Sequence, residues 1–308
     1  MSAKDFSLII LVTALWGVNF SVIKLGLESL DPFTLAGIRF LLCAFPLVFF
    51  IKKPDVSMWY VALYGLTFGV GLWGLAYLGI YFGVSAGISS LVIQMSAFLT
   101  VAMGVAFFNE KIDLIKAVGF LVAFLGLFVI LSLTDGSITL LGMFFVILGA
   151  IFWSFANVII KKSKAKRVLS FLIWSSLFSP IPLFLLAYLV QGQNIFTDFV
   201  LNMDGKAIFS ILFQVYPSTL FGYWIWNSCI DKYDMAKIAP LSLLIPIFGL
   251  LSSYLIFDEE MGSRKIIASS LIILGLVIST FSSRIKTSEW MRSVSSKVSN
   301  NASTSNLK

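Results

Sequence analysis

The residue best suited to binding chemistry is Arg39, because its charge lies well inside a long apolar segment of the chain. A charge at the centre of a bilayer costs about 2.5–3.5 kcal/mol on insertion scales. A guanidinium in such a place can hold the carboxylate of a small molecule through two parallel hydrogen bonds. In the alternative interpretation, Arg39 extends to water or pairs with Glu28, Asp31 or backbone carbonyls.

Polar side chains in other apolar segments are further candidates for a binding site. Asn19, Gln94, Asn157 and Gln214 are uncharged, and each either contacts an ammonium or carboxylate or bonds to a neighbouring helix. Lys24 ends the first apolar segment, where it either contacts a solute or extends to the membrane surface.

Aromatic side chains gather in two of the apolar segments. Trp73, Tyr77 and Tyr81 are spaced by four residues and share one helix face. The second cluster comprises Tyr223, Trp224, Trp226 and Asn227. Aromatic residues near membrane ends commonly form interfacial belts. Trp73 and Tyr77 lie deeper than such a belt, so we expect them to line a cavity with Trp16, Tyr223 and Asn227.

Enzyme chemistry finds little support in the sequence. Histidine is absent, and Cys43 and Cys229 stand alone in apolar runs without a CxxC pair. The sequence has no carboxylate pair inside an apolar segment, no phosphate-binding lysine loop and no nucleophile elbow. We therefore expect no enzyme activity, no cofactor and no metal site.

The composition places these candidates in a membrane. Of 308 residues, 59% are hydrophobic and 12% are charged, about half the charged share of soluble domains. Apolar segments of about 20 residues, enough to cross a bilayer, recur along the chain. They lie near 6–27, 33–51, 58–80, 84–108, 114–133, 139–160, 168–190, 207–230, 237–257 and 264–283. This predicts an all-α membrane protein of about ten transmembrane helices. Residues 285–308 are predicted to form a disordered basic, Ser/Asn-rich cytoplasmic tail.

The basic residues predict the orientation. With the N-terminus inside, 17 of the 22 Lys and Arg fall on the cytoplasmic side. Both termini are therefore expected in the cytoplasm, with an even number of helices. The formal charge of +7 becomes a topology signal, so we expect contact with the lipid bilayer and none with nucleic acid.

The second half of the sequence resembles the first. The segment from Trp16 to Lys24 aligns with Trp153 to Lys161 at an offset of 137 residues. A second set aligns at an offset of 150, and it pairs Ile88, Leu91, Phe98, Phe107 and Glu110 with Ile238, Leu241, Phe248, Phe257 and Glu260. We predict five-helix repeats over 1–135 and 136–284. An odd helix count inverts the second copy, an arrangement typical of secondary transporters with a site where the halves meet. The alternative is chance similarity between apolar helices.

Three motifs resemble one known family. Trp16–Leu27 followed by Leu35–Phe40 is similar to the opening of the EamA group of the drug/metabolite transporter superfamily. Residues 107–110 and 257–260 resemble the acidic motif that ends helices in that group. Residues 239–246 resemble the ninth helix of the bacterial O-acetylserine/cysteine exporter within it.

The resemblance implies ten helices, inverted repeats and a central cavity. It also implies export of amino acids or related metabolites across a bacterial inner membrane, with cysteine and O-acetylserine as the leading solutes. Trp16, Asn19, Lys24 and Arg39 match the family pattern, whereas Asn157 lies one place beyond the equivalent of Asn19. Alternating access with a zwitterion held by Arg39 is the expected mechanism. The alternatives are another metabolite or drug-like solute, or a non-transporting scaffold, and the oligomeric state stays open.

Overall fold

A computed structural model of the protein describes residues 1–108, 114–133, 135–233 and 238–281. The predicted tail and Glu110 lie outside these residues. The described residues contain ten helical spans that are long and apolar enough to cross a membrane, which confirms the prediction. They are Ala3–Gly26, Pro32–Phe49, Met58–Tyr81, Ala86–Phe107, Leu114–Leu131, Leu140–Ser163, Val168–Gln191, Gly205–Ile230, Pro240–Phe257 and Ser263–Phe281.

Polar side chains at the loop boundaries begin several of these helices. Asp31 caps α2 (Pro32–Ala44) by accepting hydrogen bonds from the amides of Phe33 and Thr34, each at 3.0 Å. Thr139 caps α8 (Leu140–Ser163) in the same way, with its hydroxyl 3.1 Å from the amide of Gly142. These oxygens accept hydrogen bonds from amide groups that have no partner within the helix. An amide without a partner would cost free energy in low-dielectric surroundings.

Several spans are built from more than one helical piece. The third span joins α3 (Met58–Gly65), a π-helical segment η2 (Leu66–Gly74) and α4 (Leu75–Tyr81). The eighth likewise joins α12 (Gly205–Phe213), the π-helical η4 (Gln214–Phe221) and α13 (Gly222–Lys232). The seventh span comprises α9, η3 and α10 (Val168–Ser175, Ser176–Phe178 and Pro180–Gln191).

Two further spans change helical geometry along their length. The fourth consists of α5 (Ala86–Ile93) and α6 (Ser96–Phe108), separated by two residues. The ninth begins with the 3₁₀ segment η5 (Ala239–Leu243) and continues as α15 (Leu244–Phe257). In addition, the connection predicted as a loop after residue 190 contains a short helix, α11 (Asn194–Leu201).

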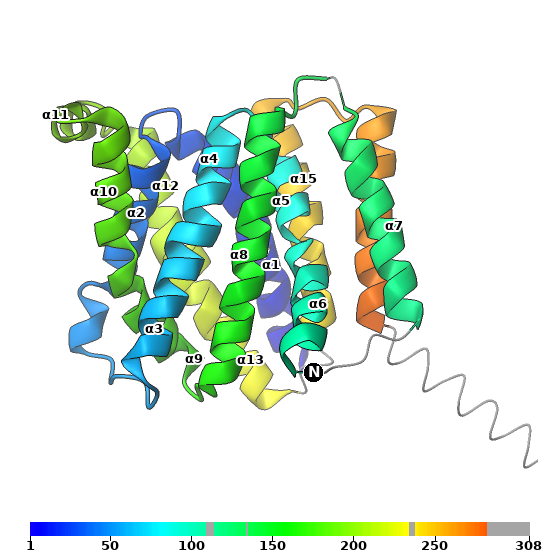
Figure 1. The fold of residues 1–308 in the computed structure, drawn as a ribbon, viewed down its shortest axis with the longest axis horizontal. Helices are drawn as coiled ribbons and strands as arrows, with labels where there is room; N and C mark the ends of the chain where they lie inside the picture. Colours follow the sequence, from blue (N-terminus) through cyan, green and yellow to red (C-terminus); the bar gives the residue numbers. More distant parts are fainter. Residues whose placement is uncertain (109–113, 134, 234–237, 282–308) are drawn as a thin grey trace, which may run out of the picture.

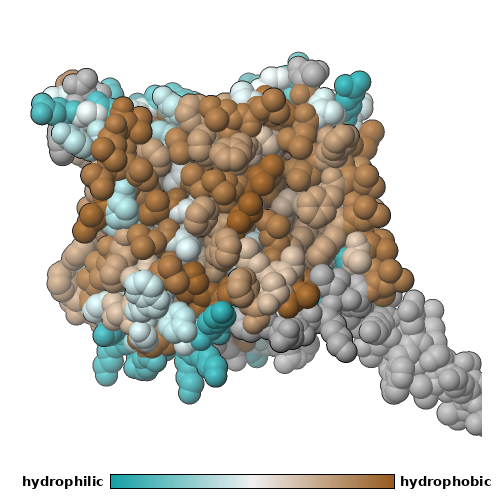
Figure 2. Space-filling model, viewed as in Figure 1, coloured by the Kyte–Doolittle hydropathy of each residue, from teal (hydrophilic) through white to brown (hydrophobic). Residues whose placement is uncertain are grey.

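The helix α1 (Ala3–Gly26) runs through the interior of the bundle, where it contacts α5, α12, α13 and α15 (Figure 1). Gly17 permits the close approach to α15, because a Cβ there would lie 2.5 Å from the carbonyl oxygen of Ile245. The helix α7 (Leu114–Leu131) and the final helix stand at one edge of the bundle. Apolar residues cover the middle of the visible face, and hydrophilic residues gather at its two ends (Figure 2).

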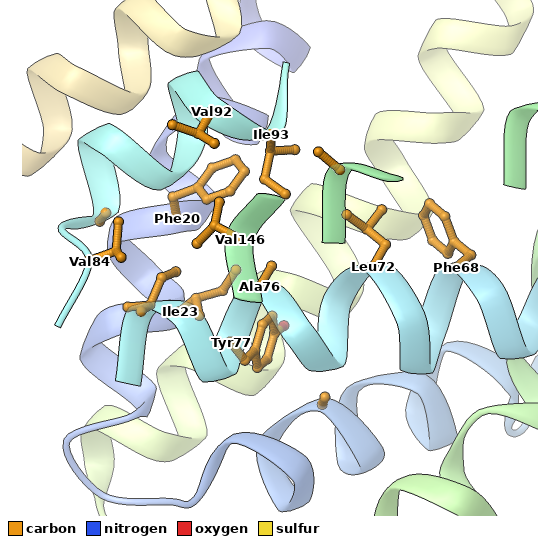
Figure 3. Close-up of a cluster of buried hydrophobic side chains, with 14 of the residues drawn as sticks. Phe20, Ile23, Phe68, Leu72, Ala76, Tyr77, Val84, Val92, Ile93 and Val146 are labelled. Carbon is orange, nitrogen blue, oxygen red and sulfur yellow. The ribbon is translucent and has the colours of Figure 1, made fainter. Parts of the chain in front are cut away.

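The core is continuous from α1 through the third span to α8. Phe20 and Ile23 of α1 pack with Leu72, Tyr77 and Val146, all of them buried (Figure 3). This packing holds the broken third span against α1 and therefore sets the walls of the space described next.

Candidate functional site

A cavity of about 220 Å³ lies inside the bundle, at the level where the spans change geometry. This central cavity is lined from the first half by Trp16, Asn19, Phe20, Arg39, Trp73, Gln94, Ser96 and Ala97. From the second half it is lined by Trp153, Asn157, Ser218, Tyr223, Ser242 and Ile245. Both halves of the chain therefore contribute to its walls.

The irregular backbone of η4, beside the central cavity, has a local cause. Pro217 lies inside η4 and has no N–H to donate. The amide of Gly222 donates to the carbonyl of Pro217, five residues earlier. The carbonyl of Ser218 instead accepts a hydrogen bond from the indole Nε1 of Trp16, at 2.8 Å. Non-helical backbone is tolerated at membrane depth where protein or a cavity surrounds it, and π-bulges are frequent at functional sites.

Arg39 brings a positive charge to the cavity wall, and its side chain is only 2% exposed. Its Nη1 donates to the Tyr77 hydroxyl at 2.9 Å, and its Nη2 donates to the Thr219 hydroxyl at 3.0 Å. The guanidinium carbon lies 4.3 Å from the centre of the Trp73 ring, a cation–π contact. Among the described residues no carboxylate lies within ion-pair distance of Arg39, so the snorkelling and carboxylate-pairing alternatives do not describe this arginine.

Three buried polar atoms of cavity residues have no hydrogen-bond partner: Nε of Arg39, Nε1 of Trp73 and Oδ1 of Asn19. Two are donors and one is an acceptor. A buried polar atom without a partner costs about 1–3 kcal/mol, so such atoms usually have a partner in the functional state. The cavity can therefore offer donors to an anionic group and an acceptor to a cationic group.

A wider space, here called the vestibule, has a volume of about 650 Å³ and shares four wall residues with the central cavity. The shared residues are Trp16, Trp153, Asn157 and Tyr223. Its outer walls include Lys166 and Arg167, close to the beginning of α9, at the end of the bundle where the N-terminus lies (Figure 1). The vestibule therefore adjoins the central cavity on the side of that end.

The opposite end of the bundle is held together by charged contacts. Lys24 Nζ lies 3.1 Å from Glu259 Oε1 and 4.2 Å from the centre of the Phe257 ring. These contacts join α1 of the first half to the end of α15 in the second.

The lysine of a second ion pair at the opposite end is more deeply buried than Lys24. Lys265 Nζ lies 3.4 Å from Asp135 Oδ2, and the Lys265 side chain is 2% exposed. Burial by itself raises the pKa of Asp135. Hydrogen bonds from the hydroxyl and amide of Ser137, followed by the charge of Lys265, outweigh burial and hold that pKa below its ordinary value.

Seven of the predicted site residues line the central cavity: Trp16, Asn19, Arg39, Trp73, Gln94, Asn157 and Tyr223. The other three lie elsewhere. Tyr77 lies behind Arg39 as a hydrogen-bond partner, and Asn227 lines the vestibule. Lys24 lies at the opposite end, outside the cavity lining, because α1 carries it about five residues beyond Asn19.

The sequence analysis did not single out several residues of the site. Trp153 lines the cavity, and its alignment with Trp16 was the signal that could have identified it. Gln214, a candidate from the sequence, lies in η4 outside the cavity lining, bonded to Ser210 and Thr219. Thr219 of η4 was missed, and it contacts Arg39 across the boundary between the halves. No spacing rule predicts that contact, because it depends on how distant helices pack.

Known proteins resemble this chain over nearly its whole described length. The sequence matches the EamA-like transporter family twice, over residues 5–132 and 140–281. A protein named "Probable amino-acid metabolite efflux pump" from Salmonella typhimurium is 36% identical over 292 residues, which cover 93% of this chain and 98% of that protein. The protein of the same name from Escherichia coli K12 is 35% identical, covering 92% of this chain and 97% of its own length.

A solved crystal structure of a protein 15% identical to this chain has the same fold, with a TM-score of 0.61. The likeness covers 92% of this chain and 99% of the other, and it concerns the fold alone. The two family matches together cover most of the chain, and the helices, the central cavity and the vestibule suit a carrier of small solutes. The chain belongs to the EamA-like transporter family.

Proposed function

We propose that this protein is a secondary transporter that exports small amino acids or closely related metabolites across the bacterial inner membrane by alternating access. The coarser part of this statement, a membrane transporter of metabolites, follows from the family and from the relatives named as amino-acid metabolite efflux pumps. The solute, the orientation and the mode of movement are the proposed part.

The observation that carries the proposal is the state of Arg39. Its charge is buried at the wall of the central cavity with neutral hydrogen-bond partners only. A buried charge is unfavourable unless an opposite charge compensates it. A solute carboxylate would supply that compensation, through the N–H groups of Arg39 and the free Nε1 of Trp73.

The other half of a zwitterion also has a place in this arrangement. Asn19 Oδ1 is a buried acceptor without a partner, which suits an ammonium group. The surrounding rings of Trp16, Trp73 and Tyr223 offer cation–π surfaces. The cavity of about 220 Å³ is smaller than the roughly 300–1,000 Å³ typical of drug-sized ligands, which favours a small solute. Cysteine and O-acetylserine are small zwitterions of this class, and they remain the leading solutes.

The path of the solute follows from the vestibule. With both termini in the cytoplasm, as the distribution of basic residues predicts, the vestibule opens to the cytoplasm and the opposite end faces outward. Export then begins with entry through the vestibule and ends with separation of the contacts around Lys24 and Glu259.

Inverted repeats would explain how the two halves move. The π-helical segments η2 and η4 lie in the third span of each half. The fourth span breaks after Gln94, and the ninth changes geometry at Leu244, which is the same offset of 150 residues that relates the two sequences. Rocking of one half against the other around the central cavity is the motion that such a pair of repeats supports.

Other solutes are the main alternative. A fixed organic cation is disfavoured, because Arg39 is positive and no Asp or Glu lines the central cavity in the described part of the chain. An anionic metabolite without an ammonium group would bind Arg39 and leave Oδ1 of Asn19 without a hydrogen-bond donor. A non-transporting scaffold would have no use for an uncompensated arginine at a cavity wall.

Counterflow in proteoliposomes tests the proposal. Purified protein is placed in vesicles loaded with one unlabelled amino acid from a panel, and uptake of labelled cysteine or O-acetylserine is measured. Exchange restricted to small neutral amino acids is the expected result. Vesicles that are sealed and contain folded protein, yet exchange none of the panel, would contradict the proposed substrate class. Exchange of carboxylates without an amino group would point to the anionic-metabolite alternative.

A further inference from the structure

We propose that Gln214, Tyr77 and Thr219 are positioning residues that hold Arg39 ready to bind the carboxylate of the solute. This inference rests on the proposed function, because it concerns the same cavity, and it adds residues outside the cavity lining. The role follows from the direction of each hydrogen bond around the guanidinium.

A chain of buried hydrogen bonds runs behind Arg39. Tyr77 and Thr219 each accept one hydrogen bond from the guanidinium, at 2.9 Å and 3.0 Å. The Tyr77 hydroxyl in turn donates to the side-chain oxygen of Gln214, and the Thr219 hydroxyl donates to the main-chain oxygen of Gln214 at 2.7 Å. The amide nitrogen of Gln214 donates to Ser210 at 2.8 Å, and Ser210 donates to the carbonyl of Val22 at 2.7 Å.

The direction of these bonds matters more than their number. A hydroxyl has one proton and can donate it once. Gln214 takes the proton of both Tyr77 and Thr219, so both hydroxyls present only lone pairs to Arg39. The guanidinium is therefore held on one side by two acceptors and keeps further N–H groups, including the unpartnered Nε, for another ligand.

Every residue of this hydrogen-bond network other than Arg39 is uncharged, and Tyr77, Gln214 and Thr219 are at most 1% exposed. The shell therefore fixes the direction of the guanidinium without neutralising its charge. A carboxylate in the same place would form an internal ion pair and compete with the solute. Neutral acceptors are the partners that orient the arginine and still leave it in need of an anion.

The positioning partners come from both halves of the protein. Tyr77 belongs to the first half, like Arg39, whereas Gln214 and Thr219 lie in η4 of the second half. The orientation of Arg39 consequently depends on how the two halves meet. The π-helical turn contributes directly, because the carbonyl of Gln214 accepts the Thr219 hydroxyl from five residues further along the chain.

The central test compares Thr219→Val with Thr219→Ser in the counterflow assay. Valine has the shape of threonine without the hydroxyl, so the Michaelis constant for the amino acid should rise about tenfold while the maximal rate is unchanged. Serine keeps the hydroxyl and should restore the wild-type Michaelis constant. Tyr77→Phe removes the other acceptor and should produce a similar rise.

Thr34→Val is the matched control, because Thr34 lies in α2 with Arg39, is equally buried and has no partner for its hydroxyl. It makes the same change in shape and polarity without touching Arg39, and its Michaelis constant should match the wild type. Thermal stability in detergent is measured for every variant. A positioning role moves the Michaelis constant, and a structural role moves the melting temperature and the maximal rate.

The inference is overturned if Thr219→Val and Tyr77→Phe keep the wild-type Michaelis constant while Arg39→Gln abolishes exchange. It is also overturned if Thr219→Ser behaves like Thr219→Val, since the hydroxyl would then not be the active group. Should Thr219→Val fail to fold, Tyr77→Phe decides alone. Absence of amino-acid exchange by the wild-type protein would be a failure of the proposed function instead, and the two failures are therefore distinguishable.

Discussion

The central cavity and the opposite end of the bundle each contain a buried cation, and the two cations differ in their partners. Lys265 lies 3.4 Å from the carboxylate of Asp135, whose side chain is 28% exposed at the membrane boundary. Arg39 lies at the cavity wall with two hydroxyls and an indole ring around it. Both cation side chains are 2% exposed, so burial by itself does not distinguish them.

The difference in partners indicates a difference in role. The charge of Lys265 is compensated inside the protein, so its ion pair can only help to hold the connection between the fifth and sixth spans against the start of the last span. The charge of Arg39 is uncompensated, and a buried charge in that state favours the binding of an external anion. On the function proposed above, a buried cation thus serves stability at one place and solute recognition at the other.

The largest effect is expected at the cavity. Arg39→Gln keeps a polar group and removes the charge, so kcat/KM for amino-acid exchange should fall about 100-fold or more. The melting temperature should not fall, since the variant loses an uncompensated charge. Counterflow and thermal unfolding in detergent measure the two quantities. Transport at the wild-type rate and affinity by protein that reaches the membrane would remove Arg39 from the site.

For the Lys265–Asp135 ion pair, we expect a loss of stability without a loss of transport. Asp135→Asn leaves Lys265 buried without its carboxylate and should cost about 1–3 kcal/mol of stability, less than for a fully buried pair because Asp135 is partly exposed. The Michaelis constant should be unchanged. Thermal unfolding of the single variant and of Asp135→Asn combined with Lys265→Met provides the check, because the double variant should recover much of the loss. A transport defect without loss of stability would contradict this contrast.

A smaller effect at the cavity is expected from Trp73→Phe. Phenylalanine retains an aromatic ring beside Arg39 and removes the free Nε1 donor. The Michaelis constant should rise about three- to tenfold, as expected for the loss of one uncharged hydrogen bond. Uptake kinetics measure it, with an amino acid and its amide compared in the same vesicles. An equal change for both solutes would mean that the indole does not contact the carboxylate.

The smallest effect is expected from pH. The pKa of Asp135 is lower in the folded protein than its ordinary value of 3.8. Its ion pair therefore contributes fully above that value, and the contribution is lost as pH falls through the folded-state pKa. The difference in melting temperature between wild type and Asp135→Asn should be constant over about pH 5–8 and shrink in stronger acid. A difference in melting temperature that already shrinks near neutral pH would contradict a lowered pKa of Asp135 in the folded protein.

The sequence by itself determined the membrane class, the ten spans and their approximate ends. These depend on long apolar segments and on the hydrogen-bonding needs of a backbone in lipid, which are local properties of the chain. The sequence also predicted seven residues that line the cavity, because polar and amphipathic side chains are rare in such apolar segments. They are Trp16, Asn19, Arg39, Trp73, Gln94, Asn157 and Tyr223.

Only the tertiary structure decided which of these groups are compensated. The sequence places Lys265 two residues into an apolar segment and gives no indication that Asp135 reaches it from another loop. It likewise does not indicate that Arg39 meets Thr219, which is 180 residues away. Compensation of a buried charge depends on distances between helices, and those distances are set by the packing of the whole bundle.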